Sequence, residues 1–199
     1  MESFLQSLRP YRLHSKNHCM RAILTFLFLL LFGVPSAWSQ ERPKLVVGIV
    51  VDQMRYEYLE RFGEHFSEGG FKKLLREGFS FENNHYNYIP TLTAPGHASI
   101  YTGSTPSGHG IIENVWFERE SGRLVSNVGD TTVRIVGSVV ENPNGLSPRR
   151  LLRHTITDQW REASDFKGKV ISLSLKDRGA ILPGGYHANA AYWYDWESS

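Results

Sequence analysis

Five polar side chains, spread over most of the chain, are of the types that together can carry out phosphoryl transfer. They are Asp52, Thr93, Asn114, Lys176 and Arg178. A threonine hydroxyl can act as a nucleophile, and a metal ion held beside it by an aspartate would lower the hydroxyl's pKa toward neutrality. The arginine fork, the lysine charge and the asparagine amide all suit phosphoryl oxygens. If these side chains share one site, they predict phosphoryl transfer through a covalent phosphothreonine intermediate.

Thr93 stands where an extended segment is expected to turn into a helix. Ala94 precedes a proline and is therefore pushed out of the helical region, whereas Pro95 suits the first helical position. Gly103 suits the position just after the last turn. Unpaired backbone N–H groups and the positive end of the helix dipole favour an anion at such a place, or a hydroxyl that is losing its proton. The alternative is that Thr93 only caps the helix, which is an ordinary role for threonine.

The charged candidates follow two predicted strands. Residues 45–51 form a continuous apolar, largely β-branched run that is typical of a central parallel strand, and Asp52 comes directly after it. Residues 169–175 predict another strand, which Lys176 and Arg178 follow. In open α/β sheets, ligands bind beyond the carboxyl ends of the strands, so these side chains are expected to meet there. A helix-capping role for Asp52 is the competing interpretation.

The other predicted elements alternate between helices and strands, which indicates an α/β fold with a mostly parallel sheet flanked by helices. Helices are predicted over residues 53–62, over residues 71–77, and from Ser147 onward with Leu151, Leu152, Ile156 and Trp160 on the buried side. Strands are predicted at residues 79–82, 131–136 and 190–196, with a hairpin formed by 115–117 and 123–125 and a turn at 142–145. His109, in a glycine-containing loop, is interpreted as polar surface.

Length and charge narrow the class of protein. A chain of 199 residues has room for one ordinary domain and a leader. The formal net charge is +2 at pH 7 and the basic residues are scattered, so nothing favours nucleic acid as a partner.

Residues 1–39 have the pattern of an export signal. Basic residues precede an almost wholly apolar run at 22–34, and small residues follow it at Ala37 and Ser39. The run is shorter than the roughly 20 residues of a membrane span, so we expect cleavage and no stable anchor afterwards. Met20 offers an alternative start. Residues 40–199 would then be a periplasmic or secreted domain without cysteine, because Cys19 lies in the leader.

The same residues carry a family resemblance. Asp52 after a strand, Thr93 in Thr-Ala-Pro-Gly-His, Asn114 in His-Gly-Ile-Ile-Glu-Asn, and Lys176-Asp177-Arg178 together resemble the alkaline phosphatase superfamily. The branch most similar comprises type I phosphodiesterases, nucleotide pyrophosphatases and the phosphate-irrepressible alkaline phosphatases that use threonine. The similarity runs from about Leu45 to the end of the chain.

The resemblance implies a role for each candidate. Thr93 would be the nucleophile and also a ligand of a zinc ion that Asp52 binds, whereas Asn114, Lys176 and Arg178 would hold the transferred phosphoryl group. In this family the Lys-x-Arg pair marks enzymes that act on phosphate monoesters, so small-molecule monoesters are the expected substrates. A type I phosphodiesterase or nucleotide pyrophosphatase is the alternative, and a sulfatase is disfavoured because its modified cysteine or serine motif is missing.

Members of the family are much longer, and the resemblance implies two zinc ions whose other ligands come from their second half. Residues 179–199 offer only His187 toward that set. We therefore expect this chain to be the amino-terminal part of the catalytic domain and to be inactive alone, with Asp-x-x-x-His and Asp-His segments encoded beyond Ser199. A truncated, non-catalytic exported binding module is the alternative from another class.

Overall fold

The computed structural model describes residues 43–138 and 145–196. Contacts divide the chain into two units, Met1–Gly48 and Ile49–Ser199, and every helix and strand named below belongs to the second. The predicted leader at 1–39, and residues 142–144 of the predicted turn, lie outside the described residues. In the part of the chain that is described, no helix has the length and apolar character needed to cross a membrane.

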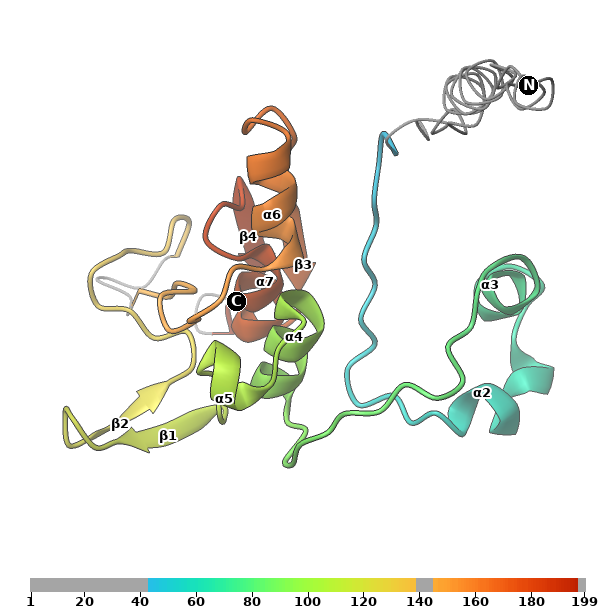
Figure 1. Ribbon diagram of the computed structural model, residues 1–199, viewed down its shortest axis with the longest axis horizontal. Helices are drawn as coiled ribbons and strands as arrows, with labels where there is room; N and C mark the ends of the chain where they lie inside the picture. Colours follow the sequence, from blue (N-terminus) through green and yellow to red (C-terminus); the bar gives the residue numbers. More distant parts are fainter. Residues whose placement is uncertain (1–42, 139–144, 197–199) are drawn as a thin grey trace, which may run out of the picture. The chain divides into compact units, whose positions relative to one another are not determined.

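Short helices and strands alternate along the described residues (Figure 1). The helices are α2 (Tyr58–Arg61), the 3-10 helix η1 (Gly63–His65), α3 (Phe71–Glu77), α4 (Thr93–Thr102), α5 (Pro106–His109), α6 (Ile156–Ala163) and α7 (Asp177–Gly184). The strands are β1 (Val115–Glu118), β2 (Arg123–Ser126), β3 (Ile171–Ser174) and β4 (Ala190–Trp193). The strands β1 and β2 form an antiparallel hairpin, whereas β3 and β4 pair in parallel.

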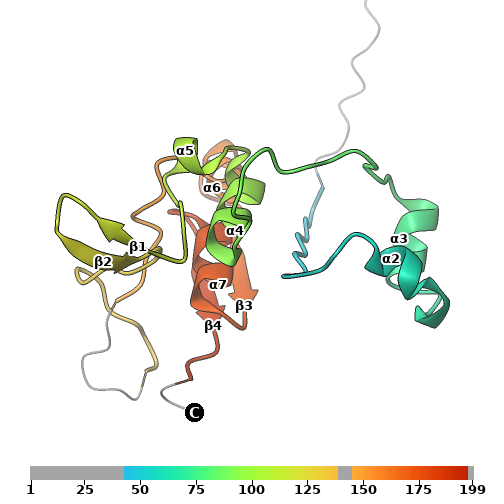
Figure 2. The ribbon, with the colours of Figure 1, turned by 90° about the horizontal axis from the view of Figure 1, so that it is seen from below.

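Helix α7 is the centre of the packing. It connects β3 to β4 as the crossover of a parallel pair, and it packs against both strands and against α4 (Figures 1 and 2). The buried hydrophobic cluster contains Ala94, Ala98, Ile111, Val128, Leu151, Ile181 and Leu182. The small alanines of α4 let the backbones of α4 and α7 approach, so the two helices hold their ends at fixed positions.

Several predicted elements are confirmed. The hairpin, α3, β3 and β4 lie where the sequence placed them. Helix α4 begins at Thr93 and includes Ala94, so the expectation that Pro95 would be its first residue is wrong by two positions. Gly103 ends α4 in the left-handed conformation, with φ of 62°, and its N–H donates to the carbonyl of Ser99. The left-handed conformation is costly for residues with a side chain and is not costly for glycine, which is why a glycine at this position predicts the end of a helix.

Three predicted strands are not formed in the described part of the chain. Residues 45–51, 79–82 and 131–136 belong to no strand, and Leu45, Ile49 and Phe79 are largely exposed. An apolar run shows that a segment suits burial but not which neighbour it pairs with, and a strand requires a hydrogen-bonded neighbour. The predicted helix over 53–62 shortens to α2.

The segment after residue 130 is a turn for a specific reason. Asp130 Oδ1 accepts hydrogen bonds from the backbone N and the hydroxyl of Thr132, at 2.9 and 2.6 Å. Asp130 Oδ2 accepts one from the hydroxyl of Ser147 at 2.5 Å. These bonds from Ser147 and Thr132 keep the pKa of Asp130 far below its usual range. Ser147 is therefore tied to Asp130, and the prediction that it starts a helix is wrong.

Helix α6 starts at Thr155 instead, in a capping box. The Thr155 hydroxyl accepts from the backbone N of Asp158 at 3.1 Å, and the Asp158 carboxylate accepts from the backbone N of Thr155 at 2.9 Å. Both residues are fully buried. Leu151 is buried as predicted, but Leu152, Ile156 and Trp160 are 71%, 67% and 37% exposed.

We predict that Thr155→Ala lowers the free energy of unfolding by about 1–2 kcal/mol, because the substitution leaves the first backbone N–H groups of α6 without their cap. Urea denaturation of the chain followed by circular dichroism measures the loss. Thr131→Ala, at an exposed position outside any helix, is the matched control. Equal stability of the two variants would contradict the role of the cap.

Candidate active site

Asp52, Thr93 and Lys176 come together, as the sequence predicts. The Thr93 hydroxyl donates to Asp52 Oδ2 at 3.4 Å, and Lys176 Nζ donates to the same oxygen at 3.1 Å. The side chains of Asp52 and Lys176 are 35% and 41% exposed, so solvent and a small ligand can reach them. A hydroxyl, a carboxylate and an ammonium group thus meet at one oxygen atom.

The fold positions these side chains from three separate segments. Thr93 is the first residue of α4, and Lys176 caps α7 just after β3. Because α4 packs against α7, the packing of the two helices fixes the starts of both. Asp52 lies in a turn that precedes α2. The prediction that Lys176 follows a strand is therefore confirmed, whereas the strand expected before Asp52 is not formed.

Asn114 also reaches the start of α4. Its Oδ1 accepts a hydrogen bond from the backbone N of Ala94 at 3.0 Å. Its backbone carbonyl accepts two bonds from Asn127, at 3.1 Å from the backbone N and 2.6 Å from Nδ2, which anchor the segment. Because Oδ1 is the acceptor, the amide's orientation is fixed and its donor group Nδ2 remains. Within the described residues, Nδ2 makes no hydrogen bond, so it is available to an acceptor such as a phosphoryl oxygen.

The start of α4 is largely occupied by the protein itself. Asn114 takes the N–H of Ala94, Pro95 has no N–H, and the N–H of Gly96 donates to the carbonyl of Leu92 at 2.9 Å. Unpaired backbone donors were expected to bind an anion here, but of the first four residues of α4 only Thr93 has an N–H group left for that purpose. Side chains must supply the remaining contacts to an anion. Leu92 holds the capping position and Thr93 is the first residue inside the helix, so Thr93 does not cap α4.

Arg178 is two residues from Lys176, but no hydrogen bond or ion pair among the described residues joins it to the other four candidates. It is in the first turn of α7, and its Nη1 is 3.5 Å from Asp177 Oδ1. Its Nε is buried without a hydrogen-bond partner. A guanidinium with one long contact and an unsatisfied N–H retains most of its capacity to bind an oxyanion.

One histidine makes a contact that the sequence did not predict, and another is buried where surface was predicted. His97 is 8% exposed, and because the carbonyl of Thr93 can only accept, His97 Nδ1 donates to it at 2.8 Å. Sequence reasoning missed this contact, although the separation of four residues along a helix was a signal. His109 is fully buried, which corrects its interpretation as surface.

His109 is held as a neutral imidazole. Its Nδ1 accepts from the backbone N of Ile111 at 3.1 Å, so the proton is on Nε2, which donates to the hydroxyl of Ser99 at 2.9 Å. Burial lowers the pKa of His109 to about 4, against a smaller opposing effect of a backbone hydrogen bond. His109 therefore links α4 to α5 and takes no part in the site.

The pKa of Asp52 is lowered below its ordinary value by its neighbours. Burial raises this pKa, but the hydrogen bond and charge of Lys176, with smaller contributions from His97 and Thr93, together outweigh burial. At neutral pH the carboxylate is ionised and is a weak base. These properties suit a metal ligand or a charge partner better than a general base.

Asp52 and Thr93 fit part of a metal site. Two ligands of one tetrahedral zinc ion lie roughly 3.4 Å apart, as follows from bonds of about 2.0–2.2 Å. The oxygens of Thr93 and Asp52 are 3.4 Å apart. Among the described residues, the groups of His, Cys, Asp and Glu close enough to hold a metal ion do not include Asp52. The described residues therefore supply no complete ligand set for an ion at Asp52 and Thr93.

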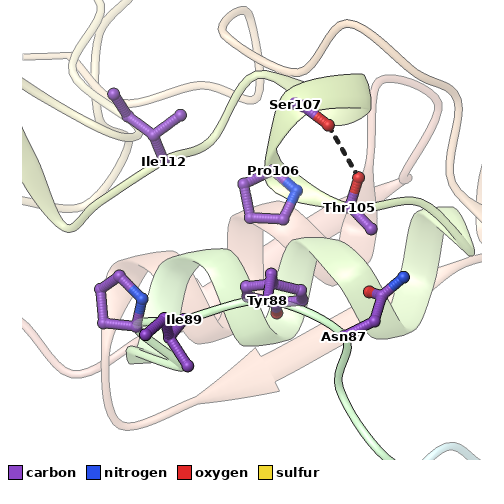
Figure 3. A pocket seen from close by; sticks show the side chains of 8 residues that line it. Asn87, Tyr88, Ile89, Thr105, Pro106, Ser107 and Ile112 are labelled. Carbon is purple, nitrogen blue, oxygen red and sulfur yellow. Dashed lines mark hydrogen bonds between the residues drawn. The ribbon is translucent and has the colours of Figure 1, made fainter.

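A separate cavity of about 410 Å³ lies near α5 and is shown in Figure 3. It is lined by Asn87, Tyr88, Ile89, Pro90, Thr105, Pro106, Ser107 and Ile112. The hydroxyls of Thr105 and Ser107 bond to each other at 2.9 Å (Figure 3). None of the five candidate residues lines this cavity.

Comparison with known sequences places the chain in a family. The sequence pattern described as Type I phosphodiesterase / nucleotide pyrophosphatase matches residues 46–199. The chain belongs to this family. One relative is the alkaline phosphatase PhoV of Synechococcus elongatus, which is 57% identical over 163 residues, 81% of this chain and 30% of PhoV. The resemblance inferred from the sequence motifs is confirmed.

Solved structures of the family agree with the α/β fold. The crystal structure of wild-type alkaline phosphatase PafA is 49% identical and has a TM-score of 0.76, covering 79% of this chain and 30% of that one. A PafA variant is 46% identical with the same TM-score and coverage; in it a threonine is replaced by serine, and an asparagine, a lysine and an arginine by alanine. The chain thus spans about 30% of the length of these relatives.

We predict that Lys176→Met raises the pKa of Asp52, because the main lowering contacts are removed and the effect of burial remains. Ionised Asp52 stabilises the fold at pH values above its unfolded-state pKa, and this stabilisation is lost as pH falls through the folded-state pKa. Because the variant raises the folded-state pKa, the loss begins at a higher pH and the stabilisation at neutral pH is smaller. Carbon-13 NMR titration of the Asp52 carboxyl measures the change. Lys72→Met, which removes the α3 partner of the exposed Glu68, should leave the pKa of Asp52 unchanged. An unaltered pKa in Lys176→Met would contradict the contact.

Proposed function

We propose that the full-length protein carrying this chain is a metal-dependent alkaline phosphatase that hydrolyses phosphate monoesters through a phosphothreonine intermediate. One observation carries the proposal. The Thr93 hydroxyl and the Lys176 ammonium group lie 3.4 and 3.1 Å from the same carboxylate oxygen, Asp52 Oδ2. Relatives named alkaline phosphatases support phosphoester hydrolysis as the class of reaction.

Thr93 acts as the nucleophile in this proposal. Its hydroxyl loses its proton to solvent and Oγ1 attacks phosphorus, so a new P–O bond forms to the threonine. The bond to the ester oxygen breaks, and this oxygen takes up a proton from solvent to release an alcohol. Water then cleaves the phosphothreonine, which restores the hydroxyl and releases inorganic phosphate. His97 positions Thr93 by bonding to its backbone carbonyl at 2.8 Å. Zinc bound at Asp52 and Thr93 would supply a lower pKa for the hydroxyl.

Three donors hold the phosphoryl group. Asn114 Nδ2 is available because its Oδ1 is bonded to Ala94, and Arg178 has an unsatisfied Nε. Lys176 adds a charge beside Asp52. The four residues replaced in the PafA variant are a threonine, an asparagine, a lysine and an arginine, in the same order and at the same spacings as in this chain. This agreement of residue type and spacing supports the assignment of Thr93, Asn114, Lys176 and Arg178.

The charges favour a monoester over a diester. A monoester presents a phosphoryl group with two charged oxygens, whereas a diester replaces one of them with an alkoxy group. Lys176 and Arg178 together match the doubly charged group. A diesterase remains the alternative, because the matching family is described by type I phosphodiesterases and nucleotide pyrophosphatases.

The proposal extends to the metal and the compartment. Two zinc ions are expected in the full-length protein, one of them bound by Asp52 and Thr93, with the other ligands supplied outside residues 43–138 and 145–196. The signal-like pattern of residues 1–39 supports export to the periplasm or the medium. If the experiments below detect no turnover, the alternative function, an exported binding module without catalysis, is favoured instead.

We predict that the zinc-loaded full-length protein hydrolyses p-nitrophenyl phosphate and that Thr93→Ala lowers kcat by at least about 10³-fold, the scale seen when a nucleophile is removed. Acid quenching during turnover should leave a phosphoryl group on the peptide that contains Thr93, detected by mass spectrometry. Thr93→Ser is the matched control, because it keeps a hydroxyl and should keep activity.

The 199-residue chain by itself is expected to be inactive in the same assay. Strong hydrolysis by this chain, lost in Thr93→Ala, would contradict the need for further metal ligands. Full activity of Thr93→Ala in the full-length protein would contradict the nucleophile itself.

We further predict that Lys176→Ala and Arg178→Ala each lower kcat/KM for p-nitrophenyl phosphate by roughly ten- to hundredfold, the scale of one charge-assisted hydrogen bond. Their effect on bis-p-nitrophenyl phosphate should be smaller, because the diester lacks one charged oxygen. Parallel rate measurements on both esters test this. A strong preference of the unaltered protein for the diester would overturn the monoesterase assignment in favour of the diesterase.

A further inference from the structure

Three potential metal ligands meet at the far end of α7 from Lys176. His154 precedes α6, Glu162 lies within α6, and His187 follows the end of α7. Their ligand atoms all lie within 4.8 Å of one another. Both imidazoles face the same carboxylate oxygen, because Glu162 Oε1 is 2.9 Å from His154 Nδ1 and 3.4 Å from His187 Nε2.

These distances are close to those that a tetrahedral zinc ion requires. Bonds of about 2.0–2.2 Å place neighbouring ligand atoms roughly 3.4 Å apart. The distance from His187 to Glu162 already has this value, and the distance from His154 to Glu162 is 0.5 Å shorter. The two imidazole nitrogens lie at most 4.8 Å apart, so an ion would draw these side chains together slightly. Two neutral imidazoles and one carboxylate are also a ligand set that zinc accepts, with a fourth position for water.

The surrounding structure holds the backbone that carries the ligands. The backbone N of His187 donates to buried Asp158 at 2.8 Å, and its carbonyl accepts from Arg161 Nε at 3.0 Å. Thr155, directly after His154, is fixed in the capping box of α6. Gly185 makes this junction possible, since a Cβ there would lie 2.3 Å from the hydroxyl of Thr155. The ligands thus stand on an ordered scaffold, as a metal site needs.

The neighbouring charge does not compete for the same atoms. Arg161, the residue before Glu162, directs its guanidinium to the carbonyl oxygens of His187, Phe166 and Gly168. The side chains of His154, Glu162 and His187 are 51%, 37% and 33% exposed, so an ion has a path from solvent. The cluster therefore has ligands, scaffold and access.

We propose that His154, Glu162 and His187 bind one zinc ion that is separate from the candidate active site. Lys176 caps the start of α7 and His187 lies beyond its end, so the helix separates the two places. An ion here joins the segment before α6 to the loop after α7 and stabilises the packing of these helices. The proposal does not depend on the phosphatase assignment.

The test uses the 199-residue chain without a polyhistidine tag and with Asp52→Asn, so that zinc at the candidate active site does not contribute. Titration with zinc chloride, followed by calorimetry, should show one equivalent bound, and zinc should raise the Tm. His154→Ala, Glu162→Gln and His187→Ala should each weaken binding at least about tenfold. Cobalt(II) should give the intense visible absorption of a tetrahedral site, lost in His187→Ala.

His85→Ala is the matched control, because it removes an exposed histidine outside the cluster and should leave zinc affinity unchanged. Circular dichroism without zinc verifies that each variant is folded. If a histidine variant is unfolded, Glu162→Gln still tests the site, because it keeps the shape of the side chain. The proposal is overturned if the starting chain binds no zinc, or if the three cluster variants bind zinc as tightly as His85→Ala.

Discussion

The packing of α4 against α7 is the interaction on which the candidate site depends. Ala94 and Ala98 of α4 are fully buried, as is Leu182 of α7. Burial of a leucine side chain stabilises a fold by about 1.5–3 kcal/mol, and the alanines keep the helix backbones near each other. Since Thr93 starts α4 and Lys176 caps α7, this apolar contact brings a hydroxyl and an ammonium group to one carboxylate. Polar geometry at the site is thus set by apolar packing behind it.

Sequence reasoning succeeded where a local pattern carries its own physical cause. Gly103 has the left-handed conformation that ends a helix, and the β-branched and leucine-rich run before Lys176 forms β3. Both features follow from residues close together in sequence, so Lys176 was placed correctly after β3, whereas α4 starts two residues before the expected position at Pro95. The α/β class followed from the same patterns.

Sequence reasoning failed where the outcome depends on a distant partner. Nothing local to Ser147 shows that its hydroxyl bonds to Asp130, or that Asn114 caps the backbone at Ala94. The run at 45–51 suits a strand, but pairing depends on a neighbour that the run does not specify. His109 shows the same limit, because only the fold reveals that Ser99 and Ile111 satisfy a buried imidazole.

In the proposed site, Asn114 connects the stability of a helix to the binding of a phosphoryl group in a single side chain. Its oxygen holds the backbone of α4, and its nitrogen is the group left for a ligand. Few replacements can separate these two tasks. Aspartate would keep the acceptor but set a negative charge beside an anion, whereas alanine would lose both groups. In the proposed site, a substitution at Asn114 would therefore change the stability of α4 and the binding of the phosphoryl group together.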